Sequence, residues 1–494
     1  MSRAEAPTPL QGAYPAAVAM ALLALCPYIV LSTASLLLQQ QLVADLATSG
    51  FGVQLAGALA NAGYAFGAVA AADLIQRVAK RVLFIACEAV FASMSLVCAL
   101  APDVVVFVIG RLGQGISTGM LLVVALPPLV TAHGVRRLPL TAAFVNLGLF
   151  GMVTAGPLVG GAVAAQGEEL AWRALFAGVG VLGLAGAGVG ALAFSRDPAP
   201  DRDAGFDYSA IPVAAAATAL PFIGVSWLSR GSFAAPGFLI PTALGLAALA
   251  TLLVRQYRKK QALMPLRLIT HTFPVTGVLA AMVAGAAFTA LIELSATFLL
   301  MARQQQPMAV GALLAPQIVG VLVAAWLFKR VLTTRFLPLL TFSGLAVVAV
   351  GGVLVVLSTT GGGRQALTLV AVAGLLLGFG AGAGVSPGLF MAGLSVESNR
   401  LGPTFALVEL LRAEAAFLVA PILLRIAMSA GGLAAGVRMA ALAAVVLTVV
   451  IGLGLLALLA LGGVRPHEPD LAGWLAGDES AFDSPRLAAV IRDD

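Results

Sequence analysis

Long apolar runs separated by short polar stretches dominate the chain between residues 14 and 462. A helix needs about 20 consecutive apolar residues to cross the roughly 30 Å hydrocarbon core of a bilayer. By this measure the pattern predicts fourteen spanning helices and an all-α integral membrane protein. The expected spans cover residues 14–38, 52–72, 82–101, 103–128, 140–165, 172–195, 209–229, 236–254, 274–302, 308–328, 336–358, 366–390, 402–428 and 433–462.

The composition supports this fold class and excludes others. Only 10% of the residues are charged, 60% are hydrophobic and the mean hydropathy is +1.02, whereas soluble domains carry about 25% charged residues. A soluble enzyme, a disordered chain and a secreted disulfide scaffold are therefore excluded. Cys26, Cys87 and Cys98 all lie in apolar runs, so we expect no disulfide framework, no metal site and no cofactor.

The Lys and Arg residues predict the orientation. If the N-terminus is cytoplasmic and the spans alternate, 20 of the 28 basic residues lie on the cytoplasmic side. Only Arg173, Arg230, Arg303 and Arg364 lie outside. Cytoplasmic loops of membrane proteins carry such an excess, which also accounts for the net charge of +6 without a nucleic-acid partner. We expect a multi-pass protein of the cell (inner, cytoplasmic) membrane with both termini in the cytoplasm. The polar tail from Val464 is expected to hold a short helix near Arg486–Arg492.

Two glycine-containing motifs lie inside the N-terminal spans. In Gly156-Pro157-Leu-Val-Gly160-Gly161, glycines four residues apart let another backbone approach closely, and the proline favours a bend. In span 103–128, Gly115 and Gly119 follow Arg111 on one helical stripe. Because an Arg at a helix centre costs about 2.5–3.5 kcal/mol on insertion scales, we expect it to face protein or water. Ordinary membrane packing and a structural hydrogen bond from this Arg are the alternative interpretations.

A charged motif follows the second span and reads Asp73-Leu-Ile-Gln76-Arg77-Val-Ala-Lys80-Arg81. An anchor at the cytoplasmic surface explains the three basic residues but not Asp73. Together, in this order and on these spans, the three motifs resemble the helix 2–3 loop, the helix-4 Arg motif and the helix-5 Gly-Pro "antiporter" motif of the major facilitator superfamily. Trp172-Arg173, Asp207-Tyr208 and Met264-Pro265-Leu266-Arg267-Leu268 further resemble its fourteen-span drug:proton antiporter branch.

The resemblance implies a specific organisation. It places six-helix bundles at residues 1–195 and 261–462, two inserted helices at 196–260 and a cytoplasmic tail at 463–494. It also implies that Arg111 takes part in proton coupling, that the charged motif forms a gate, and that the Gly-Pro helix acts as a pivot. Two departures matter. Gln76 replaces the usual glycine of the loop, and Leu31 stands where related antiporters carry a first-helix Asp. The second departure shifts proton binding to acids of the C-terminal spans.

Four acids lie inside the predicted spans, and ionisable groups at that depth are functional candidates. Glu293 has no charged neighbour in sequence, so it is a candidate proton carrier or a neutral hydrogen-bonded side chain. Glu409 and Arg412 lie on one helical face and can pair, as a structural pair or as a switchable one. Glu414 lies roughly on the other side of that helix. Glu88, about two turns from the cytoplasmic end, is expected to reach water.

Glycines and a faint repeat mark the C-terminal half. Gly374 and Gly378, and then Gly380, Gly384 and Gly388 with Pro387, predict either a flexible gate or close packing of span 366–390. Residues 324–330 resemble residues 71–77, each before a basic loop. Repeated halves with a binding site between them are typical of transporters.

The pattern therefore favours a secondary active transporter that exports amphipathic or lipophilic small molecules in exchange for protons, as in multidrug efflux and antibiotic resistance. A dedicated exporter of an endogenous lipid, metabolite or antibiotic is the main alternative. No phosphate-binding Gly-x-x-x-x-Gly-Lys-Ser/Thr loop is present in the sequence. A membrane-embedded enzyme is disfavoured because His133, His271 and His467 are scattered over cytoplasmic segments. We expect a monomer whose partners are a small-molecule substrate, protons and bilayer lipid.

Overall fold

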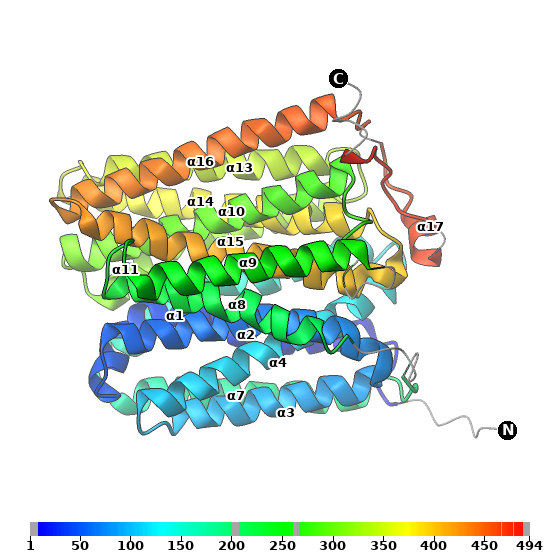
Figure 1. The fold of residues 1–494 in the computed structure, drawn as a ribbon, viewed down its shortest axis with the longest axis horizontal. Helices are drawn as coiled ribbons and strands as arrows, with labels where there is room; N and C mark the ends of the chain where they lie inside the picture. The colour runs from blue at the N-terminus through cyan, green and yellow to red at the C-terminus, as the bar shows by residue number, and fades with distance from the viewer. Residues whose placement is uncertain are drawn as a thin grey trace.

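A computed structural model describes residues 8–199, 207–259, 264, 266–465, 467–477 and 479–487. Within these residues the chain is helical and contains no named strand. The long helices run roughly side by side in two groups, one formed by the N-terminal part and one by the C-terminal part (Figure 1). Thirteen helices of the described chain are long and apolar enough to cross a membrane. The predicted all-helical fold with about fourteen spans is confirmed.

The N-terminal group holds six spans, the fifth of which is interrupted by a π-helical turn. Asp103 starts the fourth span by accepting hydrogen bonds from the backbone N–H groups of Val105 and Val106, which satisfies two donors at the helix N-terminus. The elements are α1 (Tyr14–Asp45), α2 (Gly50–Arg77), α3 (Lys80–Ala99), α4 (Val104–Thr131), α5 (Leu138–Asn146), η1 (Leu147–Gly151), α6 (Met152–Ala164) and α7 (Glu169–Ala193).

The C-terminal group contains six further spans. Its elements are α10 (Thr272–Thr297), η3 (Phe298–Ala302), α11 (Pro307–Leu314), α12 (Pro316–Val331), α13 (Leu337–Ser358), α14 (Gly363–Gly393), η4 (Ser398–Arg400), α15 (Leu401–Ser429) and α16 (Leu433–Leu461). Helix α15 brings the number of spans from thirteen to fourteen. It differs from the other thirteen because it carries four charged residues, Glu409, Arg412, Glu414 and Arg425.

Two helices lie between the groups in sequence and form a hairpin in space. They are α8 (Ala210–Ser226), extended by η2 (Trp227–Ser229), and α9 (Pro236–Arg258). Helix α8 contacts both α2 and α15, so it covers the seam between the two groups (Figure 1). Helix α9 packs mainly on α8, and its outer face exposes apolar side chains such as Ile240 and Leu244. This is the surface expected of a helix that faces lipid.

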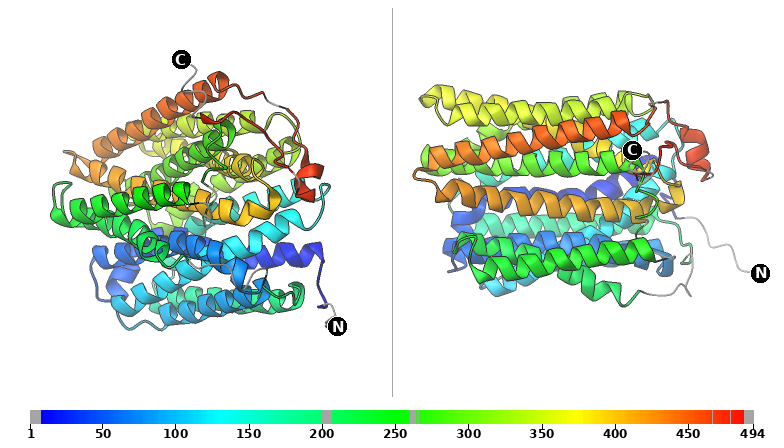
Figure 2. Two further views of the ribbon diagram at one scale, coloured as in Figure 1. Left: turned by 45° about the vertical axis from the view of Figure 1, so that its right-hand side comes forward. Right: turned by 45° about the horizontal axis from the view of Figure 1, so that its top comes forward.

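The tail packs against one end of the bundle, as both views of Figure 2 show. One short helix of the tail is α17 (Leu471–Ala476). The helix predicted near Arg486–Arg492 falls mainly on residues 488–494, which lie outside the described residues. The buried Trp474 indole donates to the Val396 carbonyl over 2.8 Å. The Ser484 hydroxyl accepts from the Phe273 N–H over 3.1 Å and thereby caps α10. We call this end of the bundle the basic end, because the connections there carry most of the Lys and Arg residues.

Candidate functional site

Arg111 is buried inside the N-terminal group, with only 2% of its surface exposed. Its Nη1 donates to Oε1 of Gln114 over 2.9 Å, and Nε2 of Gln114 donates to the Ser95 hydroxyl over 2.8 Å. The guanidinium also lies 5.7 Å from the ring centre of Tyr28 and 5.8 Å from that of Phe176, within range of a cation–π interaction. Among the described residues no carboxylate pairs with it. Arg111 therefore faces protein, as predicted.

Two stacked tyrosines, one on α1 and one on α2, extend the contacts of Arg111 toward α2. The rings of Tyr28 and Tyr64 stack with their centres 5.7 Å apart and their planes 7° from parallel. The Tyr28 hydroxyl donates to Oδ1 of Asn61 over 3.2 Å. Both tyrosines are at most 5% exposed. The stack thus connects Arg111 on α4 with the face of α2 that meets the C-terminal group.

Glu409 and Arg412 form the predicted ion pair on α15. Nε and Nη2 of Arg412 both donate to Oε2 of Glu409, over 2.9 and 2.5 Å. The same carboxylate oxygen accepts a hydrogen bond from the Tyr64 hydroxyl over 3.3 Å. A continuous chain of polar and aromatic contacts therefore runs from Arg111, through Tyr28 and Tyr64, to the ion pair in the other helix group. We call these five residues the cross-group chain.

The other membrane acids are not part of this chain. Glu414 is 4% exposed, and neither carboxylate oxygen has a hydrogen-bond partner among the described residues. Glu293 on α10 is half-buried and makes no hydrogen bond or ion pair within the described chain. The expectation that Glu88 reaches water is wrong, because it is fully buried on α3 against Gly186 of α7. The carboxylate occupies the space that a side chain at position 186 would fill.

The Gly-Pro motif lies between the two groups. A Cβ on Gly156 or Gly160 would overlap α1 near Thr33 and Ala34, so the predicted close backbone approach is confirmed. A Cβ on Gly161 would lie 2.6 Å from the Pro307 carbonyl oxygen of α11. In return, a Cβ on Gly311 would lie 2.6 Å from the Pro157 carbonyl oxygen. Helices α6 and α11 therefore meet backbone to backbone at the end of the bundle opposite the basic end.

The helix irregularity of this span precedes the proline. Pro157 sits within α6, while the π-helical turn η1 covers Leu147–Gly151. Such π-turns occur frequently at functional sites. Immediately before η1, the buried Asn146 donates from Nδ2 to the Gly382 carbonyl of α14 over 3.0 Å. Gln317 of α12 donates to the Thr154 carbonyl over 3.2 Å. The fifth span is thus hydrogen-bonded to two helices of the C-terminal group.

The remaining glycine motifs serve close packing. A Cβ on Gly115 or Gly119 would overlap the α2 backbone at Ala60 and Tyr64, so the stripe that holds Arg111 fixes α4 against α2. In α14, a Cβ on Gly378 would overlap the Gln317 backbone. Likewise, Gly380, Gly384 and Gly388 face α13 and α10, whereas Gly374 has only ordinary contacts. These contacts agree with the packing interpretation of span 366–390.

The charged motif lies at the basic end but begins within helix α2. Asp73 and Arg77 pair over 3.6 Å on its last turns, whereas the sequence predicted a loop. Arg81 donates through Nε and Nη2 to the Ala191 carbonyl of α7 over 3.3 and 3.0 Å. Lys80 is exposed. The motif therefore connects α2, α3 and α7 within the N-terminal group.

A second ion pair joins the two ends of the inserted hairpin, before α8 and after α9. It lies within electrostatic range of Asp73. Lys259 binds Oδ2 of Asp207 over 2.5 Å, and the Ser209 hydroxyl donates to Oδ1 over 2.7 Å. Partial burial raises the pKa of Asp207, but the hydrogen bonds from Lys259 and Ser209 and the nearby positive charges outweigh it. The net pKa lies below the ordinary Asp value. This carboxylate therefore stays charged at neutral pH.

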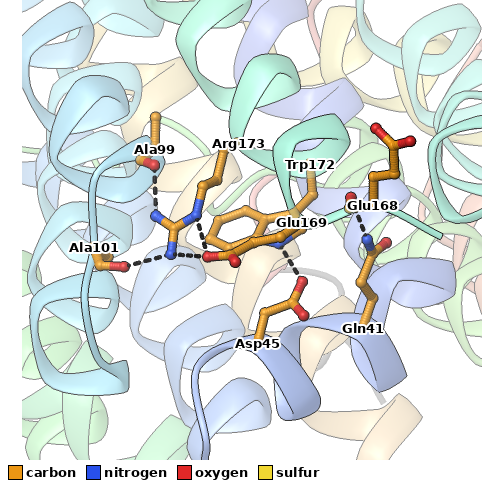
Figure 3. A network of polar contacts seen from close by, with 8 residues as sticks. All are labelled: Gln41, Asp45, Ala99, Ala101, Glu168, Glu169, Trp172 and Arg173. Atoms are coloured by element: carbon orange, nitrogen blue, oxygen red, sulfur yellow. Dashed lines mark hydrogen bonds and ion pairs between the residues drawn. The ribbon is translucent and has the colours of Figure 1, made fainter. Parts of the chain in front are cut away.

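Polar contacts also fix the opposite end of the N-terminal group (Figure 3). The guanidinium of Arg173 donates to the carbonyls of Ala99 and Ala101 over 2.7 and 2.9 Å and pairs with Glu169. The fully buried Trp172 donates from Nε1 to Oδ2 of Asp45 over 2.7 Å. The Trp172-Arg173 pair thus holds the start of α7 against the end of α1 and the α3–α4 turn.

Comparison with known proteins agrees with this architecture. The family model described as Major Facilitator Superfamily matches residues 20–411. The chain belongs to this superfamily. Its thirteen candidate spans agree with a multi-pass membrane protein of this family. Among the described residues, no three His, Cys, Asp or Glu residues gather into a metal-binding group.

Curated relatives are distant. The chain is 28% identical over 314 residues to a "Multidrug resistance protein B homolog" of Mycobacterium tuberculosis, and the match covers 63% of this chain and 56% of the relative. It is 28% identical over 283 residues to the "Uncharacterized MFS-type transporter YubD" of Bacillus subtilis, over 56% of this chain and 54% of the relative. The chain thus spans little more than half the length of the curated relatives it matches.

Proposed function

We propose that this protein is a proton-coupled exporter of amphipathic or lipophilic small molecules, of the fourteen-span drug:proton antiporter type. The cross-group chain carries the proposal. It brings a buried carboxylate of one helix group into hydrogen-bond contact with the other group. A transporter that works by alternating access needs such a contact, whose strength changes when a proton binds.

Charged Glu409 accepts two hydrogen bonds from Arg412 and one from Tyr64. Hydrogen bonds to an ionised acceptor are roughly twice as strong as neutral ones. Protonation of Glu409 removes the negative charge, weakens its bond to Tyr64 and leaves the Arg412 charge without its partner. The seam between α2 and α15 then loosens, which lets the two groups rock. Arg111, at the far end of the chain, is proposed to respond through Tyr28.

In this proposal, each end of the bundle is closed by a contact between the two helix groups, and each contact must open in turn during transport. The α6–α11 contact at Gly161 and Gly311 closes the end that we propose faces outward. At the basic end, which we propose faces the cytoplasm, Gly402 of α15 packs against Ile75 and Pro127. Opening these contacts in turn gives alternating access, with the Gly-Pro helix as the pivot. The Asp73, Arg77, Lys80 and Arg81 motif is proposed to latch the cytoplasmic gate.

Glu293 and Glu414 are the other proposed proton sites, because both lie within spans without a counter-charge among the described residues. Each proton that crosses a potential of 100 mV supplies about 2.3 kcal/mol. The scarcity of polar groups in the spans favours lipophilic cargo over sugars or organic anions. The relative named for multidrug resistance supports the same substrate class.

Transport of ethidium in proteoliposomes with an imposed pH gradient tests the proposal. We expect uphill movement that stops when an ionophore collapses the gradient. Glu409→Gln should abolish gradient-driven transport, whereas Glu88→Gln should retain it, because Glu88 is equally buried but lies away from the seam. Ethidium movement by the wild-type protein that ignores the gradient would overturn proton coupling.

Glu293→Gln and Glu414→Gln separate the remaining sites. If either variant loses the response to the pH gradient while Glu409→Gln keeps it, the proton site is that residue and the cross-group chain is structural. Loss in Glu409→Gln alone assigns the site to the ion pair.

A further inference from the structure

An apolar pocket of about 410 Å³ lies in the N-terminal group between α1, the fifth span and α7. Helix α1 forms its floor through residues between Leu22 and Val30. Leu147 and Gly148 of η1 and Met152 of α6 form one wall, and Leu175, Val179 and Leu182 of α7 form the other. Its volume falls in the range of about 300–1,000 Å³ that is typical of ligand pockets.

The backbone around this pocket is irregular on two sides. Pro27 interrupts the hydrogen bonding of α1, and η1 widens the fifth span. Cys26 donates from Sγ to the Gly148 carbonyl over 3.4 Å, which joins the two irregular segments. This bond also engages the thiol of the single cysteine in the pocket wall. The pocket therefore lies where two irregular helix segments meet.

The pocket lies near the middle of α1, α7 and the fifth span and opens onto the lipid-facing surface. Leu182, in its wall, is 44% exposed, and the adjacent Val181 is 62% exposed. Apolar cavities of this kind stay free of water. At this depth in a bilayer the neighbouring molecules are hydrocarbon chains.

We propose that this pocket binds one acyl chain of a bilayer phospholipid. A site for a specific small molecule carries a few polar groups that orient the ligand, and this pocket offers none among the described residues, since the Cys26 thiol is engaged by Gly148. A plain hydrocarbon chain needs no such group. Because Tyr28 lies on the face of α1 opposite Cys26, the bound chain supports α1 directly behind the cross-group chain.

Native mass spectrometry after reconstitution into phosphatidylethanolamine–phosphatidylglycerol nanodiscs tests this site. We expect one phospholipid to remain with the protein in detergent. Val179→Phe fills the pocket and should reduce this occupancy at least tenfold. Val181→Phe is the matched control on the same helix, since its side chain points to bulk lipid and should leave occupancy unchanged. Val30→Phe fills the pocket from α1 and serves as the second variant if Val179→Phe is poorly folded.

Modification of Cys26 by N-ethylmaleimide, mapped by peptide mass spectrometry, gives an independent readout. Delipidation should increase modification of Cys26, while Cys87 and Cys98 remain buried and unmodified. Equal lipid retention by the Val179 and Val181 variants, or no retained lipid in the wild type, would overturn the proposal. Displacement of the phospholipid by ethidium would assign the pocket to transport substrate instead.

Discussion

The hydroxyl of Tyr64 on α2 donates to the carboxylate of Glu409 on α15, and this bond joins residues 345 positions apart in sequence. The bond is buried on both sides and shares its acceptor oxygen with Arg412. The contact between the helix groups and the charge of the ion pair therefore depend on the same atom. A change in the charge of the ion pair therefore alters the contact between the helix groups.

Tyr64→Phe should shift the balance between the two access states. The variant keeps the ring stack with Tyr28 but removes the hydrogen bond to a charged acceptor, worth about 1.5–3 kcal/mol, or roughly a tenfold or larger change in the state ratio. Reaction of a cysteine placed at Gln306 with an impermeant thiol reagent measures this ratio. Tyr28→Phe, which removes only the bond to Asn61, should change it less; an equal effect of the two variants would contradict the role of the Glu409 contact.

Arg111→Lys should abolish gradient-driven transport and lower stability. An ammonium group has no planar face to lie over the Tyr28 and Phe176 rings and cannot keep the same geometry toward Gln114, so we expect a loss of about 1–3 kcal/mol. Thermal unfolding in detergent and ethidium transport measure the two effects. The exposed Arg364→Lys is the control and should behave as wild type. Normal transport by Arg111→Lys would show that the positive charge alone suffices.

Gly161→Val should favour the state in which α6 and α11 separate. A Cβ at this position already meets the Pro307 carbonyl at 2.6 Å, so a branched side chain prevents this approach. Thiol labelling at Gln306 should become faster and ethidium transport slower. Gly188→Val is the matched control, because no atom lies within 4 Å of a Cβ built there. Similar labelling rates in both variants would mean that the α6–α11 contact does not control access.

Trp172→Phe should destabilise the protein by about 1.5 kcal/mol, since it removes a hydrogen bond to the Asp45 carboxylate. Unfolding by heat or denaturant in detergent measures the loss. Trp326→Phe provides the comparison, because Trp326 is 51% exposed on a lipid-facing surface. This substitution should lower the free energy of unfolding by less than about 0.5 kcal/mol. A stability loss confined to Trp326→Phe would contradict the structural role of Trp172.

Asp207→Asn should lower stability at neutral pH by about 0.2–1 kcal/mol, the usual value for an ion pair with one exposed partner. The folded pKa of Asp207 lies below its ordinary value, and the unfolded pKa is about 3.9. The stabilisation is therefore present above about pH 4 and lost as the pH falls through the folded pKa. Unfolding curves of both proteins between pH 3 and pH 7 should converge at the acid end. A constant difference across this range would exclude the ion pair as its cause.

The spans and close-packed motifs could be predicted because both depend on local sequence. Apolar length identifies a span, and glycines four residues apart identify a face that a neighbouring backbone can approach. The pairing of Glu409 with Arg412 follows from helical spacing in the same way. These features need no knowledge of which helices are neighbours.

Contacts between distant helices could not be predicted. Tyr28 and Tyr64 look like ordinary aromatic residues of apolar helices, and Asn146 and Gln317 are neutral residues among many. Their only signal is polarity at mid-span, where a buried amide needs a partner. The prediction that Glu88 reaches water was wrong because it rested on the distance from the helix end alone. The contact with Gly186 of α7, which buries the carboxylate, cannot be inferred from that distance. The position of the tail likewise depends on a distant contact, the hydrogen bond from Trp474 to the Val396 carbonyl 78 positions earlier.

The charges of α15 also bear on how the protein enters the membrane during synthesis. At the centre of a helix an Arg adds about 2.5–3.5 kcal/mol to the free energy of insertion, and α15 carries two Arg and two Glu residues, so it inserts poorly into lipid on its own. Helix α16, which follows after a short turn and has a mean hydropathy of 2.9 in its most apolar window, is the most apolar of the candidate spans. Helix α15 contacts both α16 and α10. Its insertion therefore depends on helices on both sides of it in the sequence, and the C-terminal group should become protease-resistant only after α16 has been translated.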